Sequence, residues 1–322
     1  MASKKVVFMF SGQGSQYYQM GKQLYHEYGV FRRWLDHFNE FAIKFSGISI
    51  LAEWFANDKK ISDSFDRTIY THPAIFMFQL ALSKLLQSFT IHPDEVIGSS
   101  LGEFVAAAAT GTCDEDMAFE MVLRQAHCLE SKCAQGGMMA VISNEQDAFD
   151  PVIRYNSELV SLNGNHFVIS GDRRGLAEIE RKLKQRNISC QMLPVSYGFH
   201  SKHIDEAASD YLAYLRTLDF TFPRVDFISG CEGVRKKRYE RDYFWRVVRD
   251  PILFPDAIRN LEQEGEHLYL DLSPSGTLVN VVKQCLSSLS RSECIAVWTP
   301  YHRIESFPEQ LDSLSFKLSQ FK

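Results

Sequence analysis

The chain has 322 residues, of which 45% are hydrophobic and 23% are charged, and its formal net charge is −5. This composition indicates a globular protein of roughly two domains, and the charge gives no reason to expect a nucleic-acid partner. The apolar run from Val6 to Phe10 is too short for a signal peptide, and no stretch approaches the length of a membrane span. Seven scattered cysteines without a C-x-x-C pair favour a reduced, cytoplasmic protein.

The first predicted strand, Val6 to Phe10, runs directly into a glycine-rich loop over residues 11–16. The loop could hold a phosphate, but it lacks the Lys-Ser/Thr pair of a P-loop. Alternatively, its backbone N–H groups could point at an oxyanion that develops during a reaction. Helices are predicted over residues 17–60 in several pieces, over 74–86 with Pro73 at the start, and over 115–132 with Asp114 as the cap.

Residues 98–103, Gly-Ser-Ser-Leu-Gly-Glu, follow an apolar segment that ends at Ile97 and precede an alanine-rich run. A G-x-S-x-G pattern between a strand and a helix is typical of a nucleophile elbow, a tight turn that exposes the central serine. Ser100 is therefore the candidate nucleophile, and free N–H groups at the start of the next helix point at the same place. The alternative is an ordinary glycine-flanked turn without chemistry, so the interpretation depends on other parts of the chain.

From residue 136 the pattern changes to short strands and helices. Strands are predicted over 138–142, 159–162, 167–170 and 189–195, and helices over 145–156 and 174–185. The order β-α-β-β-α-β is that of a ferredoxin-like unit. We expect residues 134–198 to form this small subdomain, inserted into a larger α/β domain made of residues 1–133 and 199–322. In the last part, strands are predicted over 225–228 and 268–272, and helices over 201–218, 243–248, 255–264 and after Gly276.

Together these features resemble the malonyl-CoA:acyl carrier protein transacylase family, which includes the acyltransferases of polyketide synthases. The resemblance extends from Phe8 to about residue 285. Its landmarks are residues 12–16, the elbow at 98–103, Gly136-Gly137-Met138, Asn163 with Ser170-Gly171-Asp172, Phe199-His200-Ser201 and Asp271-Leu272-Ser273-Pro274. The resemblance implies an α/β fold, with an α/β-hydrolase-like core domain and an inserted ferredoxin-like subdomain. It also favours the catalytic interpretation of the elbow.

The resemblance implies that Ser100 takes the acyl group from a thioester as an ester and that His200 is its general base. A serine hydroxyl is a poor nucleophile until a base takes its proton. The other ring nitrogen of His200 would bond to a backbone carbonyl, expected at Val247. The backbone N–H groups of Gln13 and Leu101 would form the oxyanion hole. No bound cofactor or metal is expected, and the phosphopantetheine of an acyl carrier protein, or CoA, would carry the substrate.

Malonyl-specific members of the family have an arginine that pairs with the malonyl carboxylate, placed 25 residues after the nucleophile and 13 before the methionine of Gly-Gly-Met. Both counts lead here to Gln125. Arg124 is adjacent, but one helical residue corresponds to about 100° of rotation, so its side chain should leave on another face. Because an amide cannot replace the missing charge, malonyl should be a poor substrate and uncharged acyl groups should be accepted.

Within the family, the chain resembles the trans-acting acyl hydrolases that have glutamine at this position. They remove stalled acyl groups from acyl carrier proteins, which is a proofreading role in polyketide biosynthesis. We therefore predict a serine-dependent thioester hydrolase that acts through Ser100 and His200 on acyl carrier protein. The alternatives are a trans-acting acyltransferase that loads an uncharged or malonyl unit and, in another class, an inactive scaffold that binds the carrier protein.

Two departures from the family pattern, and one basic run, concern detail and not class. Ser99 stands where the family usually has histidine. His72 occurs in Thr-His-Pro where Thr-Gln-Pro is common, and it either lines the acyl pocket with Phe199 and Gln125 or only starts a helix. The basic run over residues 235–238 is either a solvated loop or a docking site for an acidic carrier protein.

Overall fold

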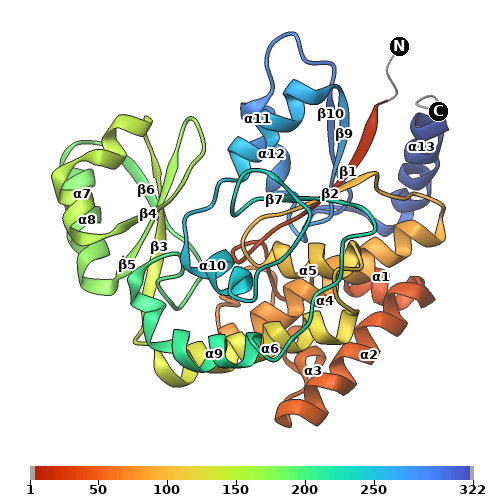
Figure 1. Ribbon diagram of the computed structural model, residues 1–322, viewed down its shortest axis with the longest axis horizontal. Helices are drawn as coiled ribbons and strands as arrows, with labels where there is room; N and C mark the ends of the chain where they lie inside the picture. The colour runs from red at the N-terminus through yellow and green to blue at the C-terminus, as the bar shows by residue number, and fades with distance from the viewer. Residues whose placement is uncertain (1–3, 320–322) are drawn as a thin grey trace.

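Two β-sheets organise the computed structural model, which describes residues 4–319 (Figure 1). The larger sheet has the strand order β10-β9-β1-β2-β7-β8, and all its neighbours pair in parallel except β7 and β8. The strands of this sheet are β1 (Lys5–Phe10), β2 (Glu95–Gly98), β7 (Asp226–Ser229), β8 (Arg235–Lys236), β9 (His267–Asp271) and β10 (Glu293–Ala296). Because Phe10 pairs with Gly98, the loops that follow β1 and β2 leave the sheet side by side.

Helices cover both faces of the larger sheet. Along β1, Val7 and Met9 pack with α11 and α12, whereas Phe8 and Phe10 belong to the main core with the helices of the other face. This alternation follows from the opposite directions of successive side chains in a strand. The helices around this sheet are α1 (Lys22–Glu27), α2 (Gly29–Ser46), α3 (Ile50–Trp54), α4 (Thr68–Ser88), α5 (Gly102–Ala109), α6 (Glu115–Lys132), α9 (Ala208–Leu215), α10 (Tyr243–Arg249), α11 (Phe254–Glu264), α12 (Leu278–Cys285) and α13 (Phe307–Ser319).

The helix that contains Pro73 begins earlier than predicted. Helix α4 starts at Thr68, so Pro73 lies inside it and not at its start. Proline has no N–H to donate to the carbonyl one turn earlier, which weakens the helix locally. Burial of nearly the whole of α4 between its neighbours compensates for the lost bond. By contrast, Asp114 caps α6 as predicted, accepting a hydrogen bond of 2.7 Å from the backbone N–H of Met117.

The smaller sheet has the order β4-β5-β3-β6 and is fully antiparallel, which is the ferredoxin-like arrangement. Two helices cover one of its faces, and the other face turns toward the larger part (Figure 1). Its elements are β3 (Gly136–Ile142), α7 (Pro151–Asn156), β4 (Glu158–Leu162), β5 (Phe167–Asp172), α8 (Arg173–Gln185) and β6 (Ser189–Met192). These elements lie within the predicted range 134–198, and the two-sheet arrangement confirms the predicted fold class.

The structure also differs from the predicted elements in three places, and the first difference has a simple cause. The helix expected over 145–156 is broken at Asp150, because the residue before Pro151 is disfavoured in the helical region, and a short 3-10 turn (Glu145–Phe149) precedes α7. Strand β6 ends at Met192, short of the predicted 195. The C-terminal elements β10 and α13 were not predicted from the sequence.

The structure also bears on membrane-spanning helices and on the state of the cysteines. Within residues 4–319, no helix is both long enough and apolar enough to span a bilayer. All seven cysteines are free thiols.

Candidate active site

Ser100 lies in the turn between β2 and α5, where the backbone is strained. Its φ angle of 52° is in the left-handed region that residues other than glycine rarely adopt. Two glycines make this turn possible. A Cβ on Gly98 would lie 2.4 Å from the backbone nitrogen of Glu103, and one on Gly102 would lie 2.0 Å from the carbonyl oxygen of Phe10. No larger side chain fits at either position, so the structure explains the spacing of the elbow glycines.

His200 approaches Ser100 from a second strained position. Its φ angle is 59°, and its Nε2 lies 2.8 Å from the Oγ of Ser100. A non-glycine residue in this region costs on the order of 1–3 kcal/mol, so both conformations persist only because their surroundings hold them. The structure thus brings together the two side chains that the sequence analysis selected, although they are 100 residues apart.

Two backbone carbonyls at the end of α10 hold His200. Its Nδ1 lies 2.7 Å from the carbonyl oxygen of Asp250, and its backbone N–H donates to the carbonyl of Val248 at 2.9 Å. The prediction that Val247 supplies the carbonyl for the ring is therefore wrong. Helix α10 ends at Arg249, and Asp250 is extended, with φ −87° and ψ 161°, as expected before Pro251. Its carbonyl consequently turns out of the helix toward the imidazole.

The electrostatics of His200 suit a base. Burial lowers its pKa to about 4, and the positive charge of nearby Arg249 acts in the same direction, while the bond to the Asp250 carbonyl opposes both. The ring is therefore neutral at neutral pH. Since a carbonyl can only accept, Nδ1 carries the proton and Nε2 presents its lone pair to the hydroxyl of Ser100.

The glycine-rich loop after β1 packs directly on the serine. A Cβ on Gly12 would lie 2.9 Å from the Cβ of Ser100. Gln13 and Leu101 line the same cavity as Ser100, and neither backbone N–H has a hydrogen-bond acceptor within residues 4–319. These are the two amides that the sequence analysis assigned to an oxyanion hole, and both are available for a ligand.

Buried polar side chains of α4, not singled out from the sequence, fix this loop. Gln79 accepts from the backbone N–H of Ser11 at 2.6 Å and donates back to its carbonyl at 3.0 Å. Thr71 accepts from the side-chain amide of Gln13 at 2.9 Å. Both residues are buried. Polar residues within the apolar sequence of α4 were the signal that could have identified them, because a buried amide needs partners.

The cavity in front of Ser100 has a volume of about 240 Å³ and lies between the two sheets. Met138 of β3 and Val168 of β5 line it from the smaller sheet, and Asn163 and Ser161 add polar groups that bond to one another at 2.9 Å. Among the described residues that line it, none is Asp, Glu, Lys or Arg. The remaining lining residues are Ser11, Gly12, Gln13, Gly14, Ser15, His72, Ser99, Leu101, Leu193, Phe199, His200, Val248, Ile252, Phe254, Thr277, Leu278 and Val281.

Of the three predicted acyl-pocket residues, two line the cavity and the third lies outside its lining. His72 and Phe199 line the cavity, with ring centroids 5.1 Å apart. Gln125 does not line it, contrary to the prediction that it forms the floor; its amide lies beside His72, which occupies the wall. Within the described chain, neither amide atom of Gln125 nor Nδ1 of His72 makes a hydrogen bond of regular geometry. Burial lowers the pKa of His72 to about 3, while the nearby Gln125 amide acts in the opposite direction, so this imidazole is neutral.

Arg124 points away from the cavity, as the helical rotation predicted. Its guanidinium bonds to Glu120 at 2.6 Å and lies over the ring of Tyr214, 4.4 Å from the centroid. Its side chain is 43% exposed. Arg124 therefore does not supply a cation to the cavity.

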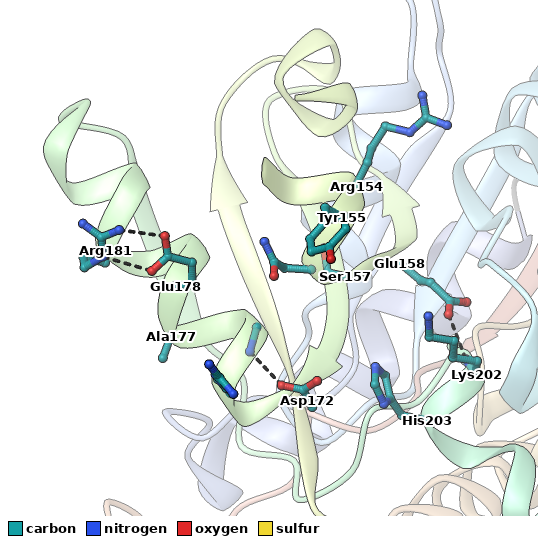
Figure 2. Close-up of a pocket in the computed structure, with 13 residues that line it drawn as sticks. Arg154, Tyr155, Ser157, Glu158, Asp172, Ala177, Glu178, Arg181, Lys202 and His203 are labelled. Atoms are coloured by element: carbon teal, nitrogen blue, oxygen red, sulfur yellow. Dashed lines mark hydrogen bonds and ion pairs between the residues drawn. The ribbon is translucent and has the colours of Figure 1, made fainter. Parts of the chain in front are cut away.

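A second, larger hollow of about 1000 Å³ lies on the smaller part between α7, α8 and the residues after His200 (Figure 2). Its charges are mixed and partly paired: Arg181 bonds to Glu178 at 2.7 Å, and Asp172 caps α8 through the backbone N–H of Gly175 (Figure 2). Ser157 and His203 line it, but among the described residues the Ser157 hydroxyl donates to the carbonyl of Ile153 and not to the imidazole. The cavity at Ser100 is therefore the candidate active site.

Two of the four residues in the basic run 235–238 are engaged in ion pairs. Arg235 and Lys236 form strand β8. Arg235 bonds to Glu95, Asp226 and Glu264 at 2.6–2.8 Å. Lys236 is 7% exposed and bonds to Glu232 and Glu240, both at 2.8 Å. These two cations stabilise the sheet edge, which weakens the interpretation of the run as a docking site.

Comparison with known proteins gives one consistent result. The family described as "Acyl transferase domain" matches residues 7–317. The polyketide biosynthesis acyltransferase homolog PksD of Bacillus subtilis (strain 168) is 42% identical over 303 residues, 94% of each chain. The homolog BaeD of Bacillus velezensis is 40% identical over 314 residues, 96% of each chain. The solved loading acyltransferase of the avermectin modular polyketide synthase superposes with a TM-score of 0.88 at 22% identity, covering 96% of this chain and 99% of that one.

Proposed function

The chain belongs to the acyl transferase domain family and has polyketide biosynthesis acyltransferase homologues, and from this premise we propose that it is an acyl hydrolase. In this proposal it releases stalled, uncharged acyl groups from the phosphopantetheine thioester of an acyl carrier protein. Ser100 is the nucleophile, His200 the general base, and water the final acceptor. The enzyme would act in the cytoplasm, where carrier proteins are loaded.

The dyad geometry supports a two-step mechanism. The Oγ of Ser100 attacks the thioester carbonyl while Nε2 of His200 takes its proton, and the Asp250 carbonyl stabilises the imidazolium through Nδ1. The N–H groups of Gln13 and Leu101 bind the tetrahedral oxyanion, a contribution of about 3 kcal/mol each. The carbon–sulfur bond then breaks, and the thiol leaves with the proton from His200. Water attacks the ester with His200 again as base, and the free acid leaves.

One observation carries the choice of uncharged substrates: the cavity wall contains no cation. No lysine or arginine lines it among the described residues, and the pKa of His72, lowered to about 3, keeps its ring neutral. Arg124 is held outside by Glu120 and Tyr214. A malonyl carboxylate would lose its hydration here without an opposite charge, which is strongly unfavourable. A short neutral acyl chain meets mainly apolar side chains.

The main alternative is a trans-acting acyltransferase, which the names of the relatives favour. It shares the acyl-enzyme and differs only in the acceptor, a second carrier thiol in place of water. An inactive scaffold is harder to reconcile with the structure. Two strained residues in hydrogen-bond contact are costly to maintain without a chemical role.

The decisive experiment is a single-turnover comparison with acyl carrier protein loaded with acetyl, butyryl or malonyl groups. Mass spectrometry follows the enzyme, the carrier and the released acid, with the Ser100→Ala variant as control. The hydrolase predicts free acid and bare carrier, with malonyl released most slowly. Faster release of malonyl than of acetyl would contradict the proposal. A lasting acyl-enzyme that transfers to a second carrier would support the transferase, and no mass change would support the scaffold.

A further inference from the structure

A buried carboxyl group lies directly behind the nucleophile and is not used in the proposed chemistry. Glu103 is in the first turn of α5, three residues after Ser100, and is fully buried. Its Oε2 accepts from the hydroxyl of Tyr243 at 2.7 Å, and its Oε1 accepts from the backbone N–H of Cys231 at 2.9 Å. The Tyr243 hydroxyl also lies 2.7 Å from the Oγ of Ser229. Neither Glu103 nor Tyr243 lines the cavity.

Tyr243 connects this group to the base. It is the first residue of α10, a helix of seven residues. The other end of α10 supplies both carbonyls that hold His200, from Val248 to its backbone N–H and from Asp250 to its ring. At about 1.5 Å per residue, only about 10 Å of rigid helix separates the two ends. A shift at Tyr243 is therefore transmitted to the carbonyls that hold the imidazole.

The same helix touches the helix of the nucleophile elbow at a second point. The rings of Phe104 and Phe244 lie 4.9 Å apart, adjacent in sequence to Glu103 and Tyr243. Aromatic packing of this kind keeps the two helices together but permits sliding, whereas a short hydrogen bond to a buried carboxyl group fixes one position. An apolar pair would fill the same space without desolvating a carboxyl group, so the pair is costly for packing alone.

We propose that Glu103 and Tyr243 are positioning residues, whose hydrogen bond sets the place of α10 relative to the elbow and so the distance between Ser100 Oγ and His200 Nε2. The inference rests on the proposed roles of Ser100 and His200 and extends them to two residues that touch no substrate. Loss of the bond should slow acylation of Ser100, because the dyad separates, and should leave binding of the acyl chain unchanged.

The test is the Tyr243→Phe variant, which removes the hydroxyl and keeps the ring. Acylation is measured in single turnover with acetyl-loaded carrier protein, as thiol released per enzyme. We expect the acylation rate constant at saturating carrier protein to fall on the order of 10–100-fold, which is the cost of a small misplacement of the reacting groups. The carrier-protein concentration that gives half of the maximal rate should stay within about twofold of the wild-type value. The matched control is Tyr269→Phe, which removes a partly buried tyrosine–glutamate bond of 2.8 Å, to Glu262, on the other face of the sheet. The control should keep its acylation rate.

Conservative variants separate positioning from stability. In Glu103→Gln the amide oxygen can still accept from the backbone N–H of Cys231, and the amide nitrogen can donate to the Tyr243 oxygen while the Tyr243 hydroxyl donates to Ser229. This variant should retain most of the rate, whereas Glu103→Ala should lose it. Equal rates for Tyr243→Phe and Tyr269→Phe at similar thermal stability would overturn the inference. If Tyr243→Phe does not fold, full activity in a folded Glu103→Ala variant would overturn it equally. Failure of the wild type to form an acyl-enzyme would instead refute the proposed function.

Discussion

The two ends of the cavity are built in opposite ways. At the reacting end, the ring nitrogens of His200 both have partners, and the serine is held by a backbone turn that only glycines permit. At the acyl end, His72 Nδ1 and both amide atoms of Gln125 are buried without a partner within the described chain. The reacting end is thus specified mainly by the backbone, with the amides of Gln13 and Leu101 left open to the cavity among residues 4–319, and the acyl end is specified by a few replaceable side chains.

This difference indicates how the two ends respond to mutation. A change in the dyad removes chemistry that no neighbour can supply, whereas a change near His72 alters which acyl group is preferred. Buried polar atoms without partners are costly, so the acyl end has stability to gain from a better-matched side chain or ligand. The dyad has little to gain, because the side chains of Ser100 and His200 are already hydrogen-bonded.

The largest effect is expected at Ser100. Ser100→Ala should lower the acylation rate by several orders of magnitude, up to about 10⁶-fold, because it removes the hydroxyl that bonds to His200. Thiol release and mass spectrometry of the enzyme measure this loss. Ser99→Ala is the matched control and should be far milder, since only the central residue of the elbow contacts His200. Substantial activity in folded Ser100→Ala would contradict the mechanism.

His200→Ala should lose most of the rate, on the order of 10⁴-fold or more, because the serine hydroxyl then lacks a base. The informative comparison is Asp250→Ala. It keeps the backbone carbonyl that accepts from Nδ1, so its activity should stay within about tenfold of the wild type. Steady-state kcat values with one neutral acyl substrate measure both variants. A loss in Asp250→Ala as large as that in His200→Ala would show that the side chain, and not the carbonyl, supports the base.

At the acyl end, Gln125→Arg alone should have a limited effect, because His72 stands between position 125 and the cavity. The double variant His72→Gln/Gln125→Arg removes the imidazole from the cavity wall and adds a cation at position 125. It should shift the preference toward malonyl over acetyl by about 1–3 kcal/mol, the strength of a charge-assisted pair. Competition between the two loaded carriers measures the shift, and Arg124→Gln serves as control. No shift in the double variant, with the fold intact, would contradict this view of the pocket.

A further expected effect is a loss of stability in acid. The folded-state pKa of His200 is about 4 and that of His72 about 3, both below the unfolded value near 6.5. Between pH 6.5 and 4 the unfolded chain therefore binds protons that the folded chain excludes, so stability falls as the pH falls. At pH 5 each histidine should cost roughly 2 kcal/mol relative to neutral pH. Thermal unfolding at pH 7 and 5 measures the loss, and His72→Gln should reduce it by about half.

The same pKa shift predicts the rate profile. Because His200 stays neutral down to about pH 4, kcat should remain nearly constant between pH 7 and 5 while the protein is folded. An acid limb of kcat near pH 6.5 would show that the base is not held in the buried, neutral form.

Local patterns in the sequence were enough to locate the candidate nucleophile. The elbow spacing predicted Ser100 and its turn, since Gly98 and Gly102 stand where a Cβ would collide with neighbouring backbone. The strand order of the smaller sheet followed from its pattern of strands and helices. The counts from Ser100 and Met138 both led to Gln125 as the position where an arginine is expected in malonyl-specific enzymes. Each inference depends on residues close in sequence or on counts along the chain.

Only the tertiary structure decided which distant atoms meet. The carbonyl that holds His200 belongs to Asp250, because Pro251 turns that residue out of α10, although the Asp-Pro dipeptide was visible in the sequence. Gln125 lies behind His72 because packing between α4 and α6 sets the depth of each side chain, which helical periodicity does not. Arg235 became part of a sheet edge because three acidic side chains from other segments converge on it. The periodicity of a helix specifies the direction in which a side chain leaves it. How deep that side chain lies, and which atoms it meets, depend on the residues that the rest of the chain places opposite.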